Sequence, residues 1–347
     1  MVTPHMRSTP TRHGGDLTAI RNAFPQTQQP WIDLSTGINP QAYPIPEIDP
    51  RIWQHLPDTQ SLGNLYQSAA DYYQVDATRI TAAPGTQALI QWLPFLRAQQ
   101  HGAGRIGVVG PTYAEHALCW TRAGHDVTQI SAPHITDGNF DVVVLVNPNN
   151  PDGRIMPGAD LIGMAAQLAA RGGWLVLDEA FMDCDPDNSF CPHLNAHLNV
   201  IILRSFGKFF GLAGLRLGFA LGAPEMVVNI SMLIGPWPVS GMACAVGALA
   251  LRDHAWITHT RARLSHAVET RDAILAQRGL HIIGSHPLFS LLDTPYADQL
   301  FTHLAQHGIY VRRFDATPHW LRIGALPDDD ASAQRLTQCL QNWRRPE

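Results

Sequence analysis

The sequence predicts an α/β protein, with a large three-layer α/β/α domain around a mainly parallel sheet and a smaller α+β domain after it. Short apolar runs alternate with helix-like stretches through the middle of the chain, which is typical of βαβ units and of a sheet covered by helices. At 347 residues the chain also exceeds the size at which one hydrophobic core stops growing. We expect an N-terminal arm over residues 1–40, a large domain over 41–255 and a small domain over 256–347.

The elements of the large domain follow from the spacing of apolar residues, because buried strands are short continuous apolar runs and helices repeat every three to four residues. The expected strands are Arg105–Val109, Val142–Val146, Trp174–Leu177, Val200–Leu203 and Leu217–Leu221. The expected helices between them are Thr86–Gln99, Ala114–Arg122 and Ala159–Arg171.

The small domain is expected to begin with a long helix, Trp256–Arg278, and to continue with alternating strands and helices. The expected strands are His281–Ile283, Leu288–Leu292, Tyr310–Arg312 and Trp320–Ile323, and the expected helices are Ala297–His307 and Ala331–Trp343. Residues 1–40 are rich in Pro, Thr, Gln and Gly, which indicates an arm rather than a packed element.

The composition excludes several classes of function. A net charge of −5 leaves no basic footprint for nucleic acid and no polybasic membrane signal. Five cysteines without a Cys-x-x-Cys pair suit free thiols in a reducing compartment, so we expect a cytoplasmic protein. The 17 histidines form no familiar zinc motif, so no metal is expected. The N-terminus lacks the apolar segment of a secretory signal.

One uncharged run, Ser231–Leu251, has the length of a membrane span. Pro236 and Pro238 interrupt it near its start, and only Met242–Leu251 has a continuous helical pattern. We therefore expect a buried helix at a domain or subunit interface rather than a span.

Lys208 is the only lysine in a chain with 23 arginines. The arginine guanidinium stays protonated and cannot form a Schiff base, whereas a desolvated lysine can lose its proton and attack a carbonyl. The position, in the stretch SFGKFFGLAGLRLGF, therefore favours covalent catalysis. The alternative is an ordinary solvated lysine in an arginine-rich chain.

Polar motifs follow the expected strands at the points where they end. They are PTY at 111–113, NPNNPDG at 147–153, DEAF at 178–181 and RSFGK at 204–208, with PGTQ at 84–87 opening a helix and Arg216 eight residues beyond the lysine. Because parallel strands place their carboxyl ends at one edge of a sheet, these residues are expected to gather there.

These motifs, in this order, resemble the fold-type I enzymes that use pyridoxal 5′-phosphate (PLP), and the resemblance covers about residues 30 to 330. It implies that Lys208 holds the cofactor and that Asp178 keeps its pyridine nitrogen protonated. Asn150 would donate to the ring oxygen O3′, and Tyr113 would stack on the ring. The cofactor phosphate would be bound by Gly85, Thr86, Gln87, Ser205 and Arg216. Structural alternatives, such as a helix cap, a turn asparagine or a surface arginine, remain for most of these positions.

Two positions depart from the pattern of this family. Phe181 stands where its aminotransferases usually have a tyrosine that donates to O3′, which weakens the case for an ordinary aminotransferase. Leu56 precedes Pro57 and Asp58 where a tyrosine commonly contacts the partner subunit's cofactor, so that contact is in doubt.

Arginines near the C-terminus resemble the substrate anchors of the branch that contains histidinol-phosphate aminotransferase. Arg312 and Arg322 match the two positions best, one for a phosphate and one for a carboxylate or equivalent group, and a bidentate guanidinium suits both anions. The choice between Arg312 and Arg313 stays open, and solvated surface arginines are the alternative.

The N-terminal arm is similar to that of the L-threonine-O-3-phosphate decarboxylases of cobalamin synthesis. The resemblance rests on the stretch HGGD at 13–16, on DLSTGINP at 33–40 and on Phe181. It implies substrate contacts from His13, Gly14, Gly15 and Asn39, for which a disordered-arm histidine and a turn asparagine are the alternatives. An arm over the site would also exclude water.

The expected activity is therefore the PLP-dependent decarboxylation of L-threonine O-3-phosphate to (R)-1-aminopropan-2-yl phosphate, by a homodimer that acts on this small molecule. The alternatives are a histidinol-phosphate or related aminotransferase, and a non-enzymatic binding or regulatory module with the same fold.

Overall fold

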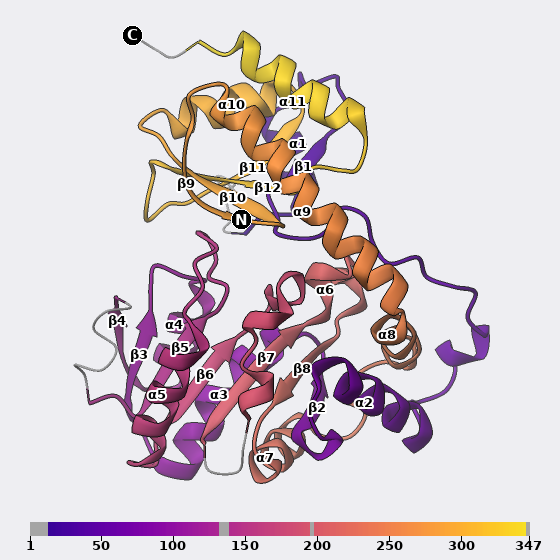
Figure 1. Ribbon diagram of the computed structural model, residues 1–347, viewed down its shortest axis with the longest axis vertical. Coiled ribbons are helices and arrows are strands. Elements are labelled where there is room, and N and C mark those ends of the chain that lie inside the picture. The colour runs from indigo at the N-terminus through magenta and orange to yellow at the C-terminus, as the bar shows by residue number, and fades with distance from the viewer. Residues whose placement is uncertain (1–12, 132–138, 195–197, 345–347) are drawn as a thin grey trace, which may run out of the picture. The chain divides into compact units, whose positions relative to one another are not determined.

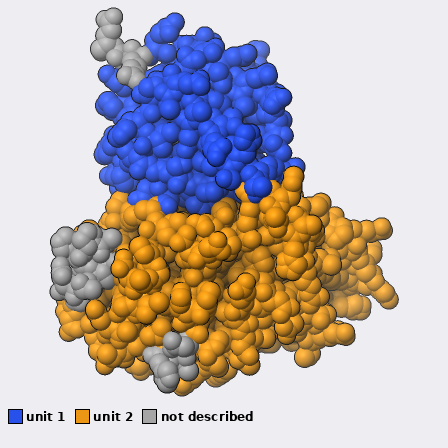
Figure 2. Space-filling view, viewed as in Figure 1, with its two compact units in different colours: residues 1–41, 151–153, 262–347 blue, residues 42–150, 154–261 orange. Residues whose placement is uncertain are grey.

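The computed structural model describes residues 13–131, 139–194 and 198–344. The chain divides into two compact units (Figure 2). Unit 1 contains residues 1–41, 151–153 and 262–347, and unit 2 contains residues 42–150 and 154–261.

Unit 2 is built on a seven-stranded sheet with the order β2-β8-β7-β6-β5-β3-β4. Its strands are β2 (Ile80–Ala83), β3 (Arg105–Val109), β4 (Asp126–Ile130), β5 (Val142–Val146), β6 (Trp174–Asp178), β7 (Val200–Ser205) and β8 (Gly218–Leu221). Five neighbouring strands, β4, β3, β5, β6 and β7, are mutually parallel. β8 runs antiparallel to both of its neighbours, β7 and β2. The five strands expected from the sequence are all present, whereas β2 and β4 were not expected.

Helices cover both faces of this sheet (Figure 1). They are α2 (Thr59–Tyr73), α3 (Thr86–His101), α4 (Glu115–Arg122), α5 (Gly158–Ala169), α6 (Phe206–Phe209), α7 (Pro224–Ile234) and α8 (Gly241–Arg252). Short 3₁₀ turns are η1 (Pro50–Trp53), η2 (Ala77–Arg79), η4 (Met182–Cys184), η5 (Pro186–Asn188), η6 (Cys191–His193) and η7 (Ala213–Leu215). Every residue of β5 and β6 is buried, because a sheet covered on both faces exposes neither set of side chains. The three-layer α/β expectation is confirmed.

Unit 1 contains a five-stranded sheet with the order β1-β11-β12-β10-β9. Its strands are β1 (Ile32–Leu34), β9 (His281–His286), β10 (Phe289–Asp293), β11 (Ile309–Arg313) and β12 (Trp320–Gly324). Its helices are α1 (Leu17–Ala23), α10 (Ala297–Gln306) and α11 (Asp330–Asn342), and α9 (His254–Ala276) carries the chain from unit 2 into unit 1.

The described part of the N-terminal segment contributes a helix and a strand to unit 1. β1 pairs in parallel with β11, and Ile20 and Leu34 lie in the apolar core of unit 1. Its apolar residues are few, but they are placed where the C-terminal sheet has an open edge. Hydrogen bonding at that edge and burial of those residues therefore outweigh the weak local propensity.

The uncharged run around residue 240 forms two helices instead of one. α7 ends at Ile234 and is followed by Gly235, which has the positive φ of +84° that a glycine accepts readily, and α8 begins at Gly241. The expected buried helix at 242–251 is thus α8. Among the described residues, no helix is both long enough and apolar enough to cross a membrane.

Candidate active site

The carboxyl ends of β6 and β7 carry the residues on which covalent chemistry would depend. Asp178 is the last residue of β6, Ser205 is the last residue of β7, and Lys208 follows in α6. The two strands are parallel neighbours, so these ends share one edge of the sheet. Lys208 Nζ lies 5.6 Å from the centre of the Phe181 ring, and Phe181 stands three residues beyond Asp178.

Asp178 is held by two hydrogen bonds in a buried environment. Its Oδ2 accepts from His116 Nε2 at 2.9 Å, and its Oδ1 accepts from the main-chain nitrogen of Ala180 at 3.0 Å. Asp178 is 4% exposed and His116 is 1% exposed. The Tyr113 ring lies edge-on to the His116 ring, with the centroids 6.1 Å apart. Asp178, His116 and Tyr113 therefore form a connected row, although Asp178 is distant in sequence from the other two.

An anion-binding cradle lies at the start of α3. Gly85 has a φ of +80° and no side chain caps the helix, so the first N–H groups and the positive end of the helix dipole are available to an anion. The Arg216 guanidinium packs against it, since a Cβ on Gly85 would lie 2.6 Å from Nη2. Gly218, opposite Ser205 in the sheet, approaches Thr86 so closely that a Cβ there would lie 2.7 Å from the Thr86 nitrogen. Ser205, Arg216 and the helix start thus gather in one place.

The loops that follow β3 and β5 are tied to this cradle and to each other. Tyr113 donates its hydroxyl to Gln87 Oε1 at 3.1 Å, so it lies beside the first turn of α3. Thr112 donates its hydroxyl to Asn149 Oδ1 at 2.7 Å, which joins the two loops. Asn150 is the next residue and is half-buried in a turn.

A buried ionic cluster fixes the strand ends behind these residues. Arg204 donates to Glu179 Oε2 at 2.6 Å and to Asp183, and its guanidinium stacks over the Tyr73 ring at 4.6 Å. Burial alone would lower the pKa of Arg204, but the carboxylates of Asp183 and Glu179 outweigh it and raise this pKa well above its ordinary value. Glu179 follows Asp178 and Arg204 precedes Ser205, so the cluster fixes the backbone that presents both site residues.

The second group of predicted residues belongs to unit 1. Arg312 and Arg322 are directly opposite each other on the antiparallel strands β11 and β12. Arg322 is 7% exposed, donates to the main-chain oxygen of Ser35 at 2.9 Å and lies over the Phe289 ring. Burial, and then the nearby charge of Arg312, lower the pKa of Arg322 to about 9. Arg313 donates to Asp298 at 3.0 Å and stacks over Phe301.

The predicted residues of the N-terminal segment surround Ser35. Gly15 donates its main-chain N–H to Ser35 Oγ at 2.8 Å, and Gly14 lies so close to the Ser35 backbone that no side chain would fit. His13 precedes them and is exposed. Because Arg322 binds the same serine, Gly14, Gly15 and Arg322 lie in one neighbourhood of unit 1.

Asn39 is 1% exposed and its Oδ1 accepts from Arg263 Nη2 at 2.7 Å and from the main-chain nitrogen of Gln41 at 3.1 Å. Asn39 is therefore held in place by a hydrogen bond from Arg263 on α9.

Sequence reasoning missed His116 and Arg263. His116 is one of 17 histidines, and its partner Asp178 lies 62 positions away, so nothing local distinguishes it. The one usable signal was its place just after the PTY motif, in the first turn of a helix that follows a strand. Arg263 lies on α9, and its partner Asn39 is 224 positions away.

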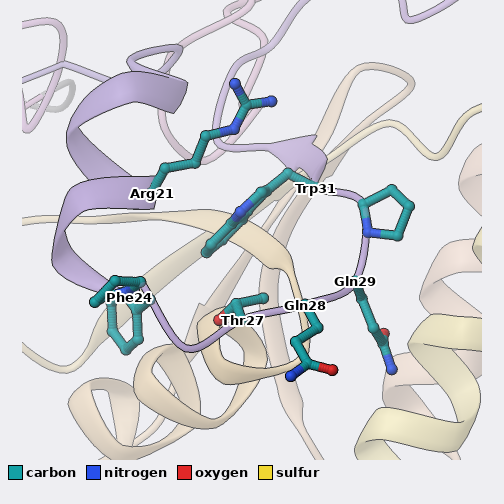
Figure 3. A pocket seen from close by; sticks show the side chains of 8 residues that line it. Arg21, Phe24, Thr27, Gln28, Gln29 and Trp31 are labelled. Carbon is teal, nitrogen blue, oxygen red and sulfur yellow. The ribbon is translucent and has the colours of Figure 1, made fainter.

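A separate pocket of about 470 Å³ lies in unit 1 and contains none of the predicted site residues (Figure 3). Trp31 crosses its middle with Arg21 on one side and Thr27 and Gln28 on the other. Amide and hydroxyl groups line it without an ionisable pair, so it offers little for catalysis.

Comparison with known proteins places these features in a family. The family model described as aminotransferase class I and II matches residues 29–334. The chain is 39% identical over 337 residues to a threonine-phosphate decarboxylase of a Sinorhizobium species, and 40% identical over 336 residues to one of Pseudomonas aeruginosa. Each alignment covers 96% of this chain and 98% of the relative.

Among solved structures, the histidinol-phosphate aminotransferase of Sinorhizobium meliloti in complex with pyridoxal-5′-phosphate superposes with a TM-score of 0.76. The match covers 98% of this chain and 97% of that one at 21% sequence identity, which is a likeness of fold. The fold is accordingly that of the fold-type I enzymes. On the match of its sequence over most of its length, the chain belongs to the aminotransferase class I and II family.

Proposed function

We propose that this protein is a PLP-dependent carboxy-lyase that converts L-threonine O-3-phosphate into (R)-1-aminopropan-2-yl phosphate, a step that the resemblance assigns to cobalamin synthesis. The observation that carries the proposal is the likeness to two threonine-phosphate decarboxylases over almost their entire length. The arrangement of unit 2 supports the cofactor, and the arginines of unit 1 support an anionic substrate.

The residues of unit 2 fit the cofactor on structural grounds. The cradle made by Gly85, Thr86, Ser205 and Arg216 supplies N–H groups, a hydroxyl and a cation at one place, which suits a phosphate. Asp178 is a buried carboxylate that already accepts two hydrogen bonds. Its oxygens can accept a further one from a protonated ring nitrogen.

PLP, when bound, supplies an aldehyde that joins the substrate amine and a protonated ring that takes up the electron pair of the breaking bond. Lys208 would hold the cofactor covalently and later return a proton to the substrate α-carbon. Asp178 would hold the ring nitrogen in its protonated form, and His116 would fix the orientation of that carboxylate. Tyr113 would pack on the ring face and Asn150 would donate to the ring oxygen.

The arginines of unit 1 would select the substrate. Arg312 and Arg322 are cations on neighbouring strands, and Arg322 is largely desolvated. A buried guanidinium gains more from a bound anion than an exposed one, because less water screens the charge. Arg312 lies opposite the desolvated Arg322 on the neighbouring strand, so we assign the substrate phosphate and carboxylate to these two arginines. Gly14 and Gly15 would make main-chain contacts, and His13 and Asn39 would make side-chain contacts.

The test is to incubate the purified holoprotein with L-threonine O-3-phosphate and no other substrate. A decarboxylase releases CO₂ through many turnovers, because the reaction needs no amino acceptor. A histidinol-phosphate aminotransferase, the second candidate, would release none and would turn over histidinol phosphate only when 2-oxoglutarate is present. A protein without visible cofactor absorbance, unchanged by Lys208→Ala, would favour a binding module.

We also propose that the protein is a homodimer of the cytoplasm. Four large apolar side chains, Trp92 and Phe95 on α3 and Val228 and Met232 on α7, are between 46% and 75% exposed, and the two helices pack against each other. Such a patch is typical of a subunit interface. Sedimentation equilibrium of the parent and of Met232→Glu would test the dimer, which the charge should weaken.

The five free cysteines suit a reducing compartment such as the cytoplasm.

A further inference from the structure

Three side chains that commonly bind metal ions converge in unit 1, and none of them belongs to the proposed cofactor or substrate residues. One ring nitrogen each of His303 and His307 and the Sγ of Cys339 lie within 4.8 Å of one another. His303 is in α10, His307 directly follows that helix, and Cys339 is in α11. The spacing of four residues places both histidines on one helix face, and their ring centroids are 4.5 Å apart.

Each imidazole has one nitrogen bonded to a main-chain carbonyl. His303 Nε2 donates to the oxygen of Cys339 at 2.9 Å, and His307 Nδ1 donates to the oxygen of His303 at 2.8 Å. A carbonyl only accepts, so in the neutral rings these nitrogens carry the proton and the other nitrogen keeps a lone pair. Metal-binding histidines are commonly fixed in this manner by an acceptor behind the ring.

The backbone around the three side chains is itself anchored. Arg335, one turn before Cys339 on α11, donates to the main-chain oxygen of His307 at 2.6 Å and to that of Pro30 at 2.5 Å. Gly308 has a φ of +70° and lies so close to the Arg335 guanidinium that a side chain would not fit. The end of α10 is therefore held against α11 (Figure 1), which reduces the conformational entropy that a metal ion would have to overcome.

We propose that His303, His307 and Cys339 form a Zn²⁺ site, with water as the fourth ligand. One thiolate and two imidazoles suit Zn²⁺, whereas Mg²⁺ and Ca²⁺ prefer oxygen ligands. With Zn–N near 2.0–2.1 Å and Zn–S near 2.3 Å, tetrahedral ligand atoms lie about 3.4–3.6 Å apart. To reach these distances the three ligand atoms need to approach by about 1 Å.

Binding of Zn²⁺ to the Cys339 thiol releases one proton. The ion replaces the thiol proton of Cys339, and this proton leaves to solvent as the Zn–S bond forms. No oxidant or further reactant is required. The bound ion would join α10 to α11 and would stabilise the native chain, because unfolding separates the three ligands.

The experiment uses the metal-stripped holoprotein, titrated with Co²⁺ as a spectroscopic probe and with Zn²⁺ in competition with a chromophoric chelator. We expect one equivalent of Co²⁺ per chain, with the visible bands of a tetrahedral ion and a thiolate charge-transfer band in the difference spectrum. Zn²⁺ should displace it and should raise the Tm, whereas Mg²⁺ should do neither. The readout does not depend on turnover, so it stands or fails separately from the proposed activity.

Cys339→Ser and His307→Gln should each weaken Zn²⁺ binding by at least about 100-fold. The matched controls are Cys244→Ser, another buried cysteine, and His259→Gln, an exposed histidine of α9, and both should bind as the parent does. If Cys339→Ser fails to fold, judged by circular dichroism, His307→Gln supplies the test at a half-buried position. Absence of the tetrahedral spectrum, or a spectrum that persists in His307→Gln, would overturn the proposal, as would weak binding of several ions that no variant changes.

Discussion

At the scale of single residues, Lys208 has no substitute, because it is the only lysine in the chain. We expect Lys208→Ala and Lys208→Arg to lose turnover while the fold, followed by circular dichroism, stays intact. The arginine variant keeps the positive charge but cannot bond to a carbonyl carbon, so it separates charge from covalent chemistry. Activity within about tenfold of the parent in either variant would contradict this role.

His116 offers a second test at this scale, because in the proposed site it would act on the cofactor through its hydrogen bond to Asp178. His116→Phe removes the hydrogen bond to a buried carboxylate, a loss of about 1.5–3 kcal/mol, or roughly tenfold to hundredfold in cofactor affinity. Titration of the apoprotein with PLP measures it. The matched control is His125→Gln on the same side of the sheet, whose ring bonds to Pro94 and Gly104. That variant should lose stability and keep its cofactor affinity, and equal losses in both variants would argue against a special role of His116.

At the scale of elements, the buried cluster of Arg204, Glu179 and Asp183 joins the ends of β6 and β7. Arg204→Met leaves two carboxylates without their cation, so we expect it to lower the free energy of unfolding by about 3–5 kcal/mol, measured by urea denaturation. Replacing Glu179 and Asp183 by Gln and Asn in addition should restore much of that loss, because no buried charge then remains unpaired. If Arg204→Met were as stable as the parent, the ionic cluster would not stabilise the strand ends in the way proposed.

The pairing of β11 with β12 brings two cations together. Burial and the nearby charge of Arg312 lower the pKa of Arg322, so a bound anion would relieve an unfavourable charge at this position. Arg322→Leu should raise KM for threonine phosphate roughly tenfold to hundredfold. Arg313→Leu, whose guanidinium pairs with Asp298, is the neighbouring control. A larger effect at Arg313 would reverse the assignment.

Periodicity in the sequence was enough to predict most elements, but not the edge strands β1, β2 and β4. β5 is a run of apolar residues buried on both faces and is visible in the sequence. β4, with the sequence DVTQI, is an edge strand with mostly exposed side chains. β2, with the sequence ITAA, is only four residues long and has one large apolar side chain, so neither strand has a clear apolar pattern. β1 has three residues and exists because β11 offers it a hydrogen-bonding edge, which no local signal announces.

At the scale of the whole molecule, the sequence was enough to predict which residues lie at the carboxyl ends of the parallel strands. Residues that end or follow parallel strands, such as Asp178, Ser205 and Tyr113, lie at one edge of the sheet because of the strand order and direction. Contacts between distant segments could not be predicted in this way. His116 meets Asp178, and Arg263 meets Asn39, only after helices have packed, so their identity depends on tertiary geometry.

The parallel pair of β1 and β11 also constrains how the protein is made. Ile32 leaves the ribosome early, yet its strand partner Ile309 is synthesised almost a full chain length later, roughly 15–55 s at ordinary elongation rates. Unit 2 is complete well before then, whereas the opening segment must wait with its apolar side chains exposed to chaperones. A nascent chain arrested before residue 309 should therefore carry a protease-resistant middle and a protease-sensitive beginning.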